Sequence, residues 1–113
     1  ATLIKGKYID DERFARAFAN DKVRYDKWGK RKVEQALFLK HIDEDIRHRV
    51  LDEIEDEDFK EALRPLLLAK MKSVKAKSDY ELNCKLIRFA MGRGYDLEEI
   101  NDCLEDIFRN TEQ

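Results

Sequence analysis

The sequence predicts an all-α protein, built from tandem repeats of three-helix units and elongated in shape. The 113 residues include one Pro and four Gly, and no stretch sustains the apolar–polar alternation of a β-strand. Apolar residues instead recur at helical spacing in six segments. Charged residues make up 42% of the chain, and an elongated stack of helices has more surface to carry them than a compact sphere.

The first helix is expected over residues 11–26, with Asp10 as its N-cap. The two acids after Asp10 would then lie in the first turn, where the helix dipole favours negative charge. Ile9 and Phe14 have the spacing of a hydrophobic staple across this cap. Phe14 and Phe18 predict a buried stripe along the helix.

The second and third helices complete the first unit. They are expected over residues 29–40 and 43–54, with Asp43 opening the third. Each shows an apolar face at spacings of three and four residues. These faces comprise Val33, Ala36 and Leu37, and then Ile46, Val50 and Ile54.

The fourth helix, over residues 56–76, contains Pro65. Because proline lacks a backbone N–H and collides with the preceding turn, we expect a kink or break there. Two capping boxes, Ser78 with Glu81 and Asp96 with Glu99, open the last two helices. These helices are expected over residues 79–93 and 96–109.

The six helices align as two copies of one unit. "KHID" at 40–43 aligns with "RGYD" at 93–96. On the first helix of each unit, Phe14, Ala17 and Phe18 align with Phe59, Ala62 and Leu63. On the second helix, Val33, Ala36 and Leu37 align with Leu86, Phe89 and Ala90. Such tandem units are typical of helical repeat proteins. We expect repeats at residues 10–54 and 55–113, preceded at 1–9 by the tail of a truncated first repeat, because the chain opens without Met and in mid-pattern.

Charge is segregated along the chain although the net charge is only −2. Residues 22–32 are basic, residues 43–61 are acidic, and residues 64–77 are basic without any acid. This segregation favours a charged partner. The candidate partner-binding residues are Arg24, Lys27, Lys30, Arg31 and Lys32.

Cations near the start of a helix oppose its dipole, so helix stability does not explain Lys30, Arg31 and Lys32. An anionic partner would explain them, and the alternative is a merely solvated start of the helix. Tyr25 or Trp28 could stack on a base. We favour Trp28 as a structural residue that packs between the first two helices.

Several kinds of chemistry lack their residues. There is no Gly-rich phosphate loop, and His41, His48, Cys84 and Cys103 do not have zinc-site spacing. The carboxylates lie mostly on caps and polar faces, which favours a solvated acidic surface over a catalytic pair. We therefore expect no metal, no cofactor, no small-molecule substrate and no enzymatic activity.

The cysteines and the apolar runs bear on where the protein resides. Cys84 and Cys103 fall at apolar-periodic positions of separate helices, so we expect reduced core thiols in a cytoplasmic protein. No apolar run is long enough to span a membrane, and the start lacks the apolar core of a signal peptide.

"YIDDERFARAF", followed by Gly29, a basic-apolar helix and "LFLKHID", resembles the RecX regulators of the RecA recombinase. The matching residues are Tyr8, Asp10, Asp11, Phe14 and Ala15, then Gly29, Val33, Leu37 and Ile42. "RGYDLEEI" at 93–100 is similar to the same turn in the family's third repeat. His41 stands where this turn usually has Gly, and His adopts left-handed backbone more readily than most residues.

The resemblance implies a regulator without a catalytic site that binds the RecA filament on single-stranded DNA and inhibits its recombinase and ATPase activities. The partner surface would be the filament's DNA, its protein groove, or both, with weak direct DNA binding. The alternative is a helical DNA-binding module of the helix-turn-helix kind, which would bind duplex alone with steep salt dependence.

Overall fold

The computed structural model describes residues 2–111, with side chains over residues 10–110. It contains six helices in this range: α1 (Thr2–Arg24), α2 (Lys30–Leu39), α3 (Glu44–Glu53), α4 (Asp56–Ser73), α5 (Asp79–Gly92) and α6 (Leu97–Thr111). Between residues 2 and 111 there is no strand, and the molecule measures 60 × 24 × 20 Å. The predicted elongated, all-α fold is confirmed.

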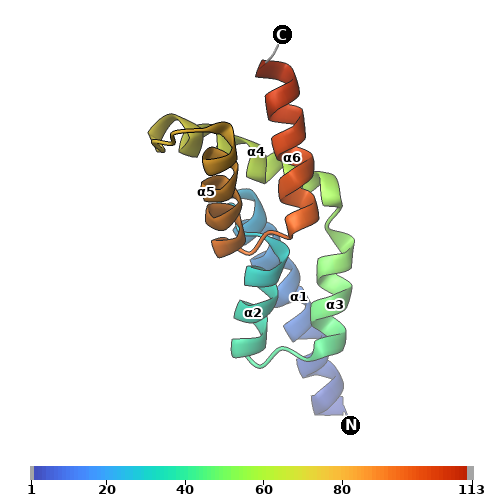
Figure 1. The fold of residues 1–113 in the computed structure, drawn as a ribbon. Helices are drawn as coiled ribbons and strands as arrows, with labels where there is room; N and C mark the ends of the chain where they lie inside the picture. Colours follow the sequence, from blue (N-terminus) through green and yellow to red (C-terminus); the bar gives the residue numbers. More distant parts are fainter. Residues whose placement is uncertain (1, 112–113) are drawn as a thin grey trace.

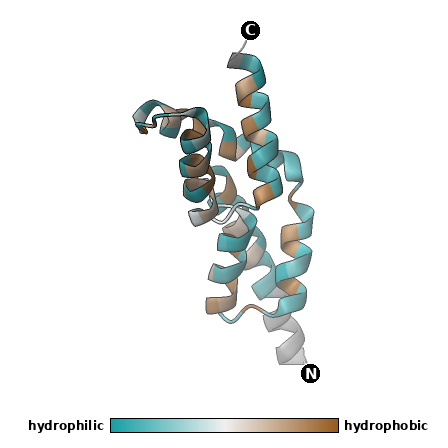
Figure 2. Ribbon diagram, viewed as in Figure 1, coloured by the Kyte–Doolittle hydropathy of each residue, from teal (hydrophilic) through white to brown (hydrophobic). Residues whose placement is uncertain are grey.

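The helices form two units of three along the rod (Figure 1). Helices α1, α2 and α3 all contact one another, as do α4, α5 and α6, and α1 contacts α4 between the units. Hydrophobic and hydrophilic segments alternate along the helices (Figure 2), and the buried positions of the described residues are apolar apart from Glu99 and glycines. None of the described helices combines the length and apolar composition of a membrane span.

One continuous core runs through both units. Its largest fully buried side chains come from all six helices and from the turn before α6. They include Val23, Val33, Leu37, Ile46, Leu51, Phe59, Leu63, Leu67, Leu86, Tyr95 and Ile100. Because the core is shared, the two units stabilise each other.

The start of α1 differs from the prediction. The helix runs unbroken from Thr2 through Asp10, so the N-cap at Asp10 is wrong. No proline interrupts residues 2–10, and helix formation is cooperative, so an existing helix extends through a residue that could have capped it. The side chains of Tyr8 and Ile9, which entered the signature and the staple, lie outside the described residues.

The buried face of α1 is also shifted by one residue. Ala15, Ala19 and Val23 are buried, whereas Phe14 is 46% exposed and stacks on Phe18 at 5.7 Å between ring centroids. Small side chains allow α3 to pack closely against α1. The burial pattern therefore matches Ala15, Ala19 and Val23 with Phe59, Leu63 and Leu67, and the predicted pairing of Phe14 with Phe59 is wrong.

The turns after α2 and α5 have the same conformation. His41 has φ 65° and Gly94 has φ 96°. In the first turn the N–H groups of His41 and Ile42 donate to Phe38 and Leu37; in the second, those of Gly94 and Tyr95 donate to Met91 and Ala90. Both turns are Schellman motifs, which confirms the alignment of residues 40–43 with 93–96.

The other predicted caps are confirmed in part: Asp43 occupies the N-cap position of α3 without a side-chain cap bond, whereas Ser78 caps α5 with its side chain. The Ser78 hydroxyl accepts a hydrogen bond from the N–H of Glu81 at 3.2 Å, while the Glu81 carboxylate accepts one from Lys77 at 3.0 Å. The N–H of Asp96 donates to Glu99 Oε1 at 3.1 Å. Only Asp96 departs from the box, because its side chain pairs with Arg31 instead.

Helix α4 continues through Pro65 as far as Ser73, so of the expected kink or break the break is wrong, and the kink stays a prediction. Pro65 lies on the exposed side of the helix. Proline has no N–H, so the Glu61 carbonyl receives no hydrogen bond from residue 65. On the exposed side of the helix water can bind this carbonyl instead, which limits the cost of the lost bond.

Candidate functional site

The basic stretch lies at the middle of the rod, where the two units meet. Helix α1 ends at Arg24, and a short link with Lys27 at φ 58° leads to Gly29, the N-cap of α2. The N–H of Trp28 donates to the carbonyl of Lys22 at 2.9 Å. The link therefore folds back on the end of α1 and places the basic residues around the junction.

Three of the five predicted binding residues have partners within the molecule. Lys30 Nζ lies 3.8 Å from Asp52 Oδ1, and Arg31 Nε lies 2.8 Å from Asp96 Oδ1. Lys32 Nζ lies 4.7 Å from the centroid of the Trp28 ring. The ion pairs are exposed, so each contributes little to stability and leaves the cation accessible to a partner.

The other two, Arg24 and Lys27, line an open cleft of about 320 Å³. Asp58, Glu61 and Ala62 of α4 line its other side. Neither cation forms an ion pair within the described part of the chain. The mixed charge of this cleft suits a polar or zwitterionic surface better than a polyanion.

Trp28 lies partly buried against the core, as expected for a structural residue. Its ring packs edge-on to Phe18 at 6.3 Å between centroids. Lys22 and Lys32 lie over it at 5.0 and 4.7 Å. Tyr25, in contrast, is 78% exposed.

Backbone groups join the two units directly. The N–H of Gly29 donates to the Arg93 carbonyl at 2.8 Å, and the N–H of Arg31 donates to the Gly94 carbonyl at 3.0 Å. The buried Tyr95 hydroxyl donates to the Lys27 carbonyl at 3.0 Å. We call this contact, made by residues 26–31 and 93–95, the inter-unit joint.

Arg93 reinforces the inter-unit joint from the second unit. Its guanidinium donates to the carbonyls of Asp26 and Lys27. Burial raises the pKa of the Tyr95 hydroxyl, so this group remains a hydrogen-bond donor at physiological pH. The sequence analysis missed both residues, although "RGY" after an apolar helix marks the turn that carries them.

A second hollow, of about 130 Å³ and acidic, includes Lys30 of the basic stretch in its lining. It is lined by Lys30, Asp56, Lys60, Asp96, Glu98, Glu99 and Asp102. Burial is the main cause that raises the pKa of Glu99, and Asp96 and Asp56 add to it. Among the described residues no group of His, Cys, Asp and Glu could hold a metal ion.

The two cysteines lie in different environments, and neither forms a disulfide. Cys103 is buried as predicted, donates to the Lys60 carbonyl at 3.7 Å, and has a pKa raised by burial to about 11. Cys84 is exposed, so its assignment to the core is wrong. It lies on the outer face of α5, one position outside the stripe that buries Leu86 and Ala90.

The comparisons with known proteins agree with the repeat architecture. Residues 10–51 match the family model described as "RecX, second three-helix domain", and residues 56–104 match "RecX, third three-helix domain". No solved structure is significantly similar to the chain.

Curated relatives named "Regulatory protein RecX" match most of the chain. The protein of Clostridium perfringens (strain 13 / Type A) is 33% identical over 103 residues, which is 89% of this chain and 46% of the relative. That of Clostridium acetobutylicum is 30% identical over 110 residues, 94% of this chain and 50% of the relative. The chain thus spans about half the length of these relatives, and it belongs to the RecX family of regulatory proteins.

Proposed function

We propose that this chain binds the RecA nucleoprotein filament on single-stranded DNA and lowers its ATPase and recombinase activities, without being an enzyme itself. The observation that carries the proposal is the consecutive match to two RecX domains, over residues 10–51 and 56–104. Relatives that match most of the chain are named regulatory proteins. Its two unbridged cysteines fit a reducing compartment such as the cytoplasm.

The filament-facing surface that we propose includes Arg24, Lys27, Lys30, Arg31 and Lys32. These residues gather at the middle of a rod 60 Å long, so a partner that bound them would also lie along both units. The ion pairs of Lys30 and Arg31 are exposed, and an anionic partner can compete for both cations at small cost.

A titration of RecA ATPase on single-stranded DNA tests the proposal. The chain should lower ATP hydrolysis of preformed filaments in proportion to its concentration. The triple variant Lys30→Gln, Arg31→Gln, Lys32→Gln should inhibit less, and its salt dependence should be shallower. Neutral glutamine is the suitable replacement because glutamate would add repulsion from Asp52 and Asp96.

Two results would contradict the proposal. The first is full RecA activity at saturating concentrations of the chain. The second is tight, steeply salt-dependent binding to duplex DNA alone, which would favour a helix-turn-helix-like DNA-binding module.

A further inference from the structure

A second basic surface lies away from the inter-unit joint. It is formed by the end of α4, the link of residues 74–78 and the start of α5. Residues 62–78 contain no Asp or Glu, although the whole chain has 25 acids. We call residues 70–80 the lysine arm, since Lys70, Lys72, Lys75 and Lys77 lie within it.

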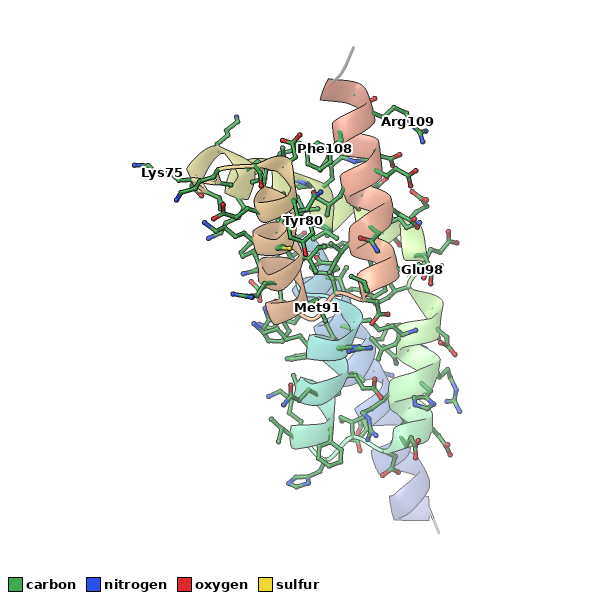
Figure 3. The ribbon with its side chains drawn as sticks, in the orientation of Figure 1. Lys75, Tyr80, Met91, Glu98, Phe108 and Arg109 are labelled. Atoms are coloured by element: carbon green, nitrogen blue, oxygen red, sulfur yellow. The ribbon has the colours of Figure 1, made fainter. Side chains whose placement is uncertain are left out.

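The lysine arm projects from the rod. Its link leaves α4 at Ser73 and enters α5 at Asp79, and Figure 1 shows this connection at the outer tip of the second unit. Lys75 points outward from this tip, on the opposite side of the molecule from Glu98 of α6 (Figure 3). Helix α6 carries five acids and one arginine, so the second unit has a basic side and an acidic side.

Internal contacts use only some of the cations on this side. Lys70 Nζ lies 5.0 Å from the centroid of the Phe89 ring. Lys85 pairs with Glu81 at 3.2 Å and donates to the Lys75 carbonyl at 2.7 Å.

Four other side chains on this surface, Lys72, Lys75, Lys77 and Arg88, are exposed and form no ion pair with any acid of the described residues. The nearby acid Glu81 already accepts hydrogen bonds from the Lys77 N–H and binds Lys85. Asp79 is the one acid within residues 70–80, against four lysines, so the arm presents a net positive charge to solvent. Close spacing of such cations is unfavourable in the free protein and is relieved by an anionic ligand.

Tyr80 follows the link of residues 74–78 closely along the chain and is 80% exposed. It lies in the first turn of α5, and Arg88 follows on the same helix about two turns later. The ring leaves its face open to stack on a planar group. Exposed aromatics next to lysines that follow a phosphate backbone are typical of single-strand binding surfaces.

We propose that the lysine arm binds single-stranded nucleic acid directly. Lys72, Lys75 and Lys77 contact successive phosphates, and Tyr80 stacks on an unpaired base. Arg88 extends the cationic track along α5. This proposal does not rest on binding to the RecA filament.

Fluorescence anisotropy of a labelled oligothymidylate with the full chain tests the proposal. Replacing Lys72, Lys75 and Lys77 together with Gln should weaken binding at least tenfold at low salt. The slope of log K against log salt should fall by about 2, since each phosphate contact on a single strand contributes about 0.7. Tyr80→Ala should weaken binding about fivefold or more, and Tyr80→Phe should keep it.

The matched control is the triple variant Lys30→Gln, Arg31→Gln, Lys32→Gln, which removes the same charge. It should change oligothymidylate binding less than threefold while it impairs RecA inhibition. Circular dichroism should show equal melting temperatures for the arm variants and the parent, because the replaced side chains are exposed. The two triple variants thus separate failure of this proposal from failure of the proposed function.

Four results would overturn the inference. Equal loss of affinity in both triple variants would mean that only total charge matters. Binding to duplex of the same sequence as tight as to the single strand, or a Tyr80→Ala variant that binds like the parent, would remove the role of an unpaired base. Equal affinity for vesicles of anionic lipid would indicate a general polyanion surface.

Discussion

Gly29 and Gly94 lie against each other at the inter-unit joint, and neither position has room for a side chain. A Cβ atom on Gly29 would lie 2.2 Å from the carbonyl carbon of Gly94, and one on Gly94 would lie 2.5 Å from Cβ of Lys32. Gly29 has an ordinary φ of −81°, so space alone requires glycine there. Gly94 needs glycine for both space and its positive φ.

The first prediction follows from this close approach. Gly29→Ala should lower the free energy of unfolding by about 3 kcal/mol, because the obstructing atoms belong to the backbone and cannot rotate away. Urea unfolding followed by circular dichroism measures it. Gly92→Ala is the matched control: it lies in α5 with open space around its Cβ position, and it should gain up to about 1 kcal/mol. A Gly29→Ala variant as stable as the parent would show that the joint is not packed this closely.

Tyr95→Phe should cost about 1 kcal/mol. The change removes the hydrogen bond from the buried hydroxyl to the Lys27 carbonyl and keeps the ring in the core. The carbonyl retains a bond from Arg93 at 3.3 Å, which limits the loss. The same urea titration applies, and Tyr80→Phe, on an exposed ring, should cost nothing. Equal effects of the two changes would argue against the buried bond.

His41→Gly should raise stability by about 0.5–1 kcal/mol. His41 has φ 65°, a left-handed conformation that glycine adopts without the Cβ penalty. Thermal melts can compare it with Lys40→Gly, where φ is −88° and the change should destabilise. A loss of stability in His41→Gly would mean that the imidazole makes a compensating contact.

Trp28→Ala should cost about 2 kcal/mol, below the roughly 3–5 kcal/mol of a fully buried aromatic residue. The ring is only partly buried, against Phe18 and beneath Lys22 and Lys32. Tyr25→Ala is the control and should change stability by less than about 0.5 kcal/mol. If Trp28→Ala left stability intact and abolished partner binding, Trp28 would be a contact residue.

The last prediction concerns pH. Burial raises the pKa of Glu99 above its ordinary 4.5, with Asp96 and Asp56 reinforcing the shift and Lys30 opposing it. The folded state therefore binds this proton more tightly than the unfolded state does. The contribution of Glu99 to the free energy of unfolding consequently falls as pH rises through the raised pKa. Glu99→Gln removes this titration. The stability of the variant relative to the parent should therefore increase from pH 4 to pH 7, as measured by urea unfolding at each pH, and a constant difference would contradict it.

Helical periodicity predicted the fold well because each helix buries one face in a shared core. The bounds of α2, α3, α5 and α6 lie within two residues of the prediction. Besides the break at Pro65 and the burial of Cys84, the main error falls on α1, where two phenylalanines were expected to form the core stripe. Small residues form the buried stripe instead, because Ala15 and Ala19 let the neighbouring helix approach closely. The hydrophobicity of the sequence alone does not reveal which apolar face a neighbouring helix covers.

The candidate site was harder to predict, because sequence shows charges but not their partners. Lys30 and Arg31 meet Asp52 and Asp96, which lie 22 and 65 residues away along the chain. The inter-unit joint combines two backbone hydrogen bonds with bonds from the Arg93 and Tyr95 side chains to backbone carbonyls, and residue type does not reveal which carbonyls accept them. Binding by the basic stretch stays a prediction for the filament experiment.

The joint also bears on contacts between copies of the chain. The turn at Arg93 and Gly94, whose carbonyls accept the joint's hydrogen bonds, has its counterpart in the turn at His41 after α2. His41 carries the Cβ that Gly94 lacks. In the same contact, this atom would collide with the facing backbone and side chain, as a Cβ on Gly94 would. The donor end of the joint does not recur on α5, where the position equivalent to Gly29 is Leu82 inside the helix, with its N–H bonded to Ser78. The contact that joins the two units therefore cannot repeat unchanged between copies of the chain, because the two repeats differ at both of its ends.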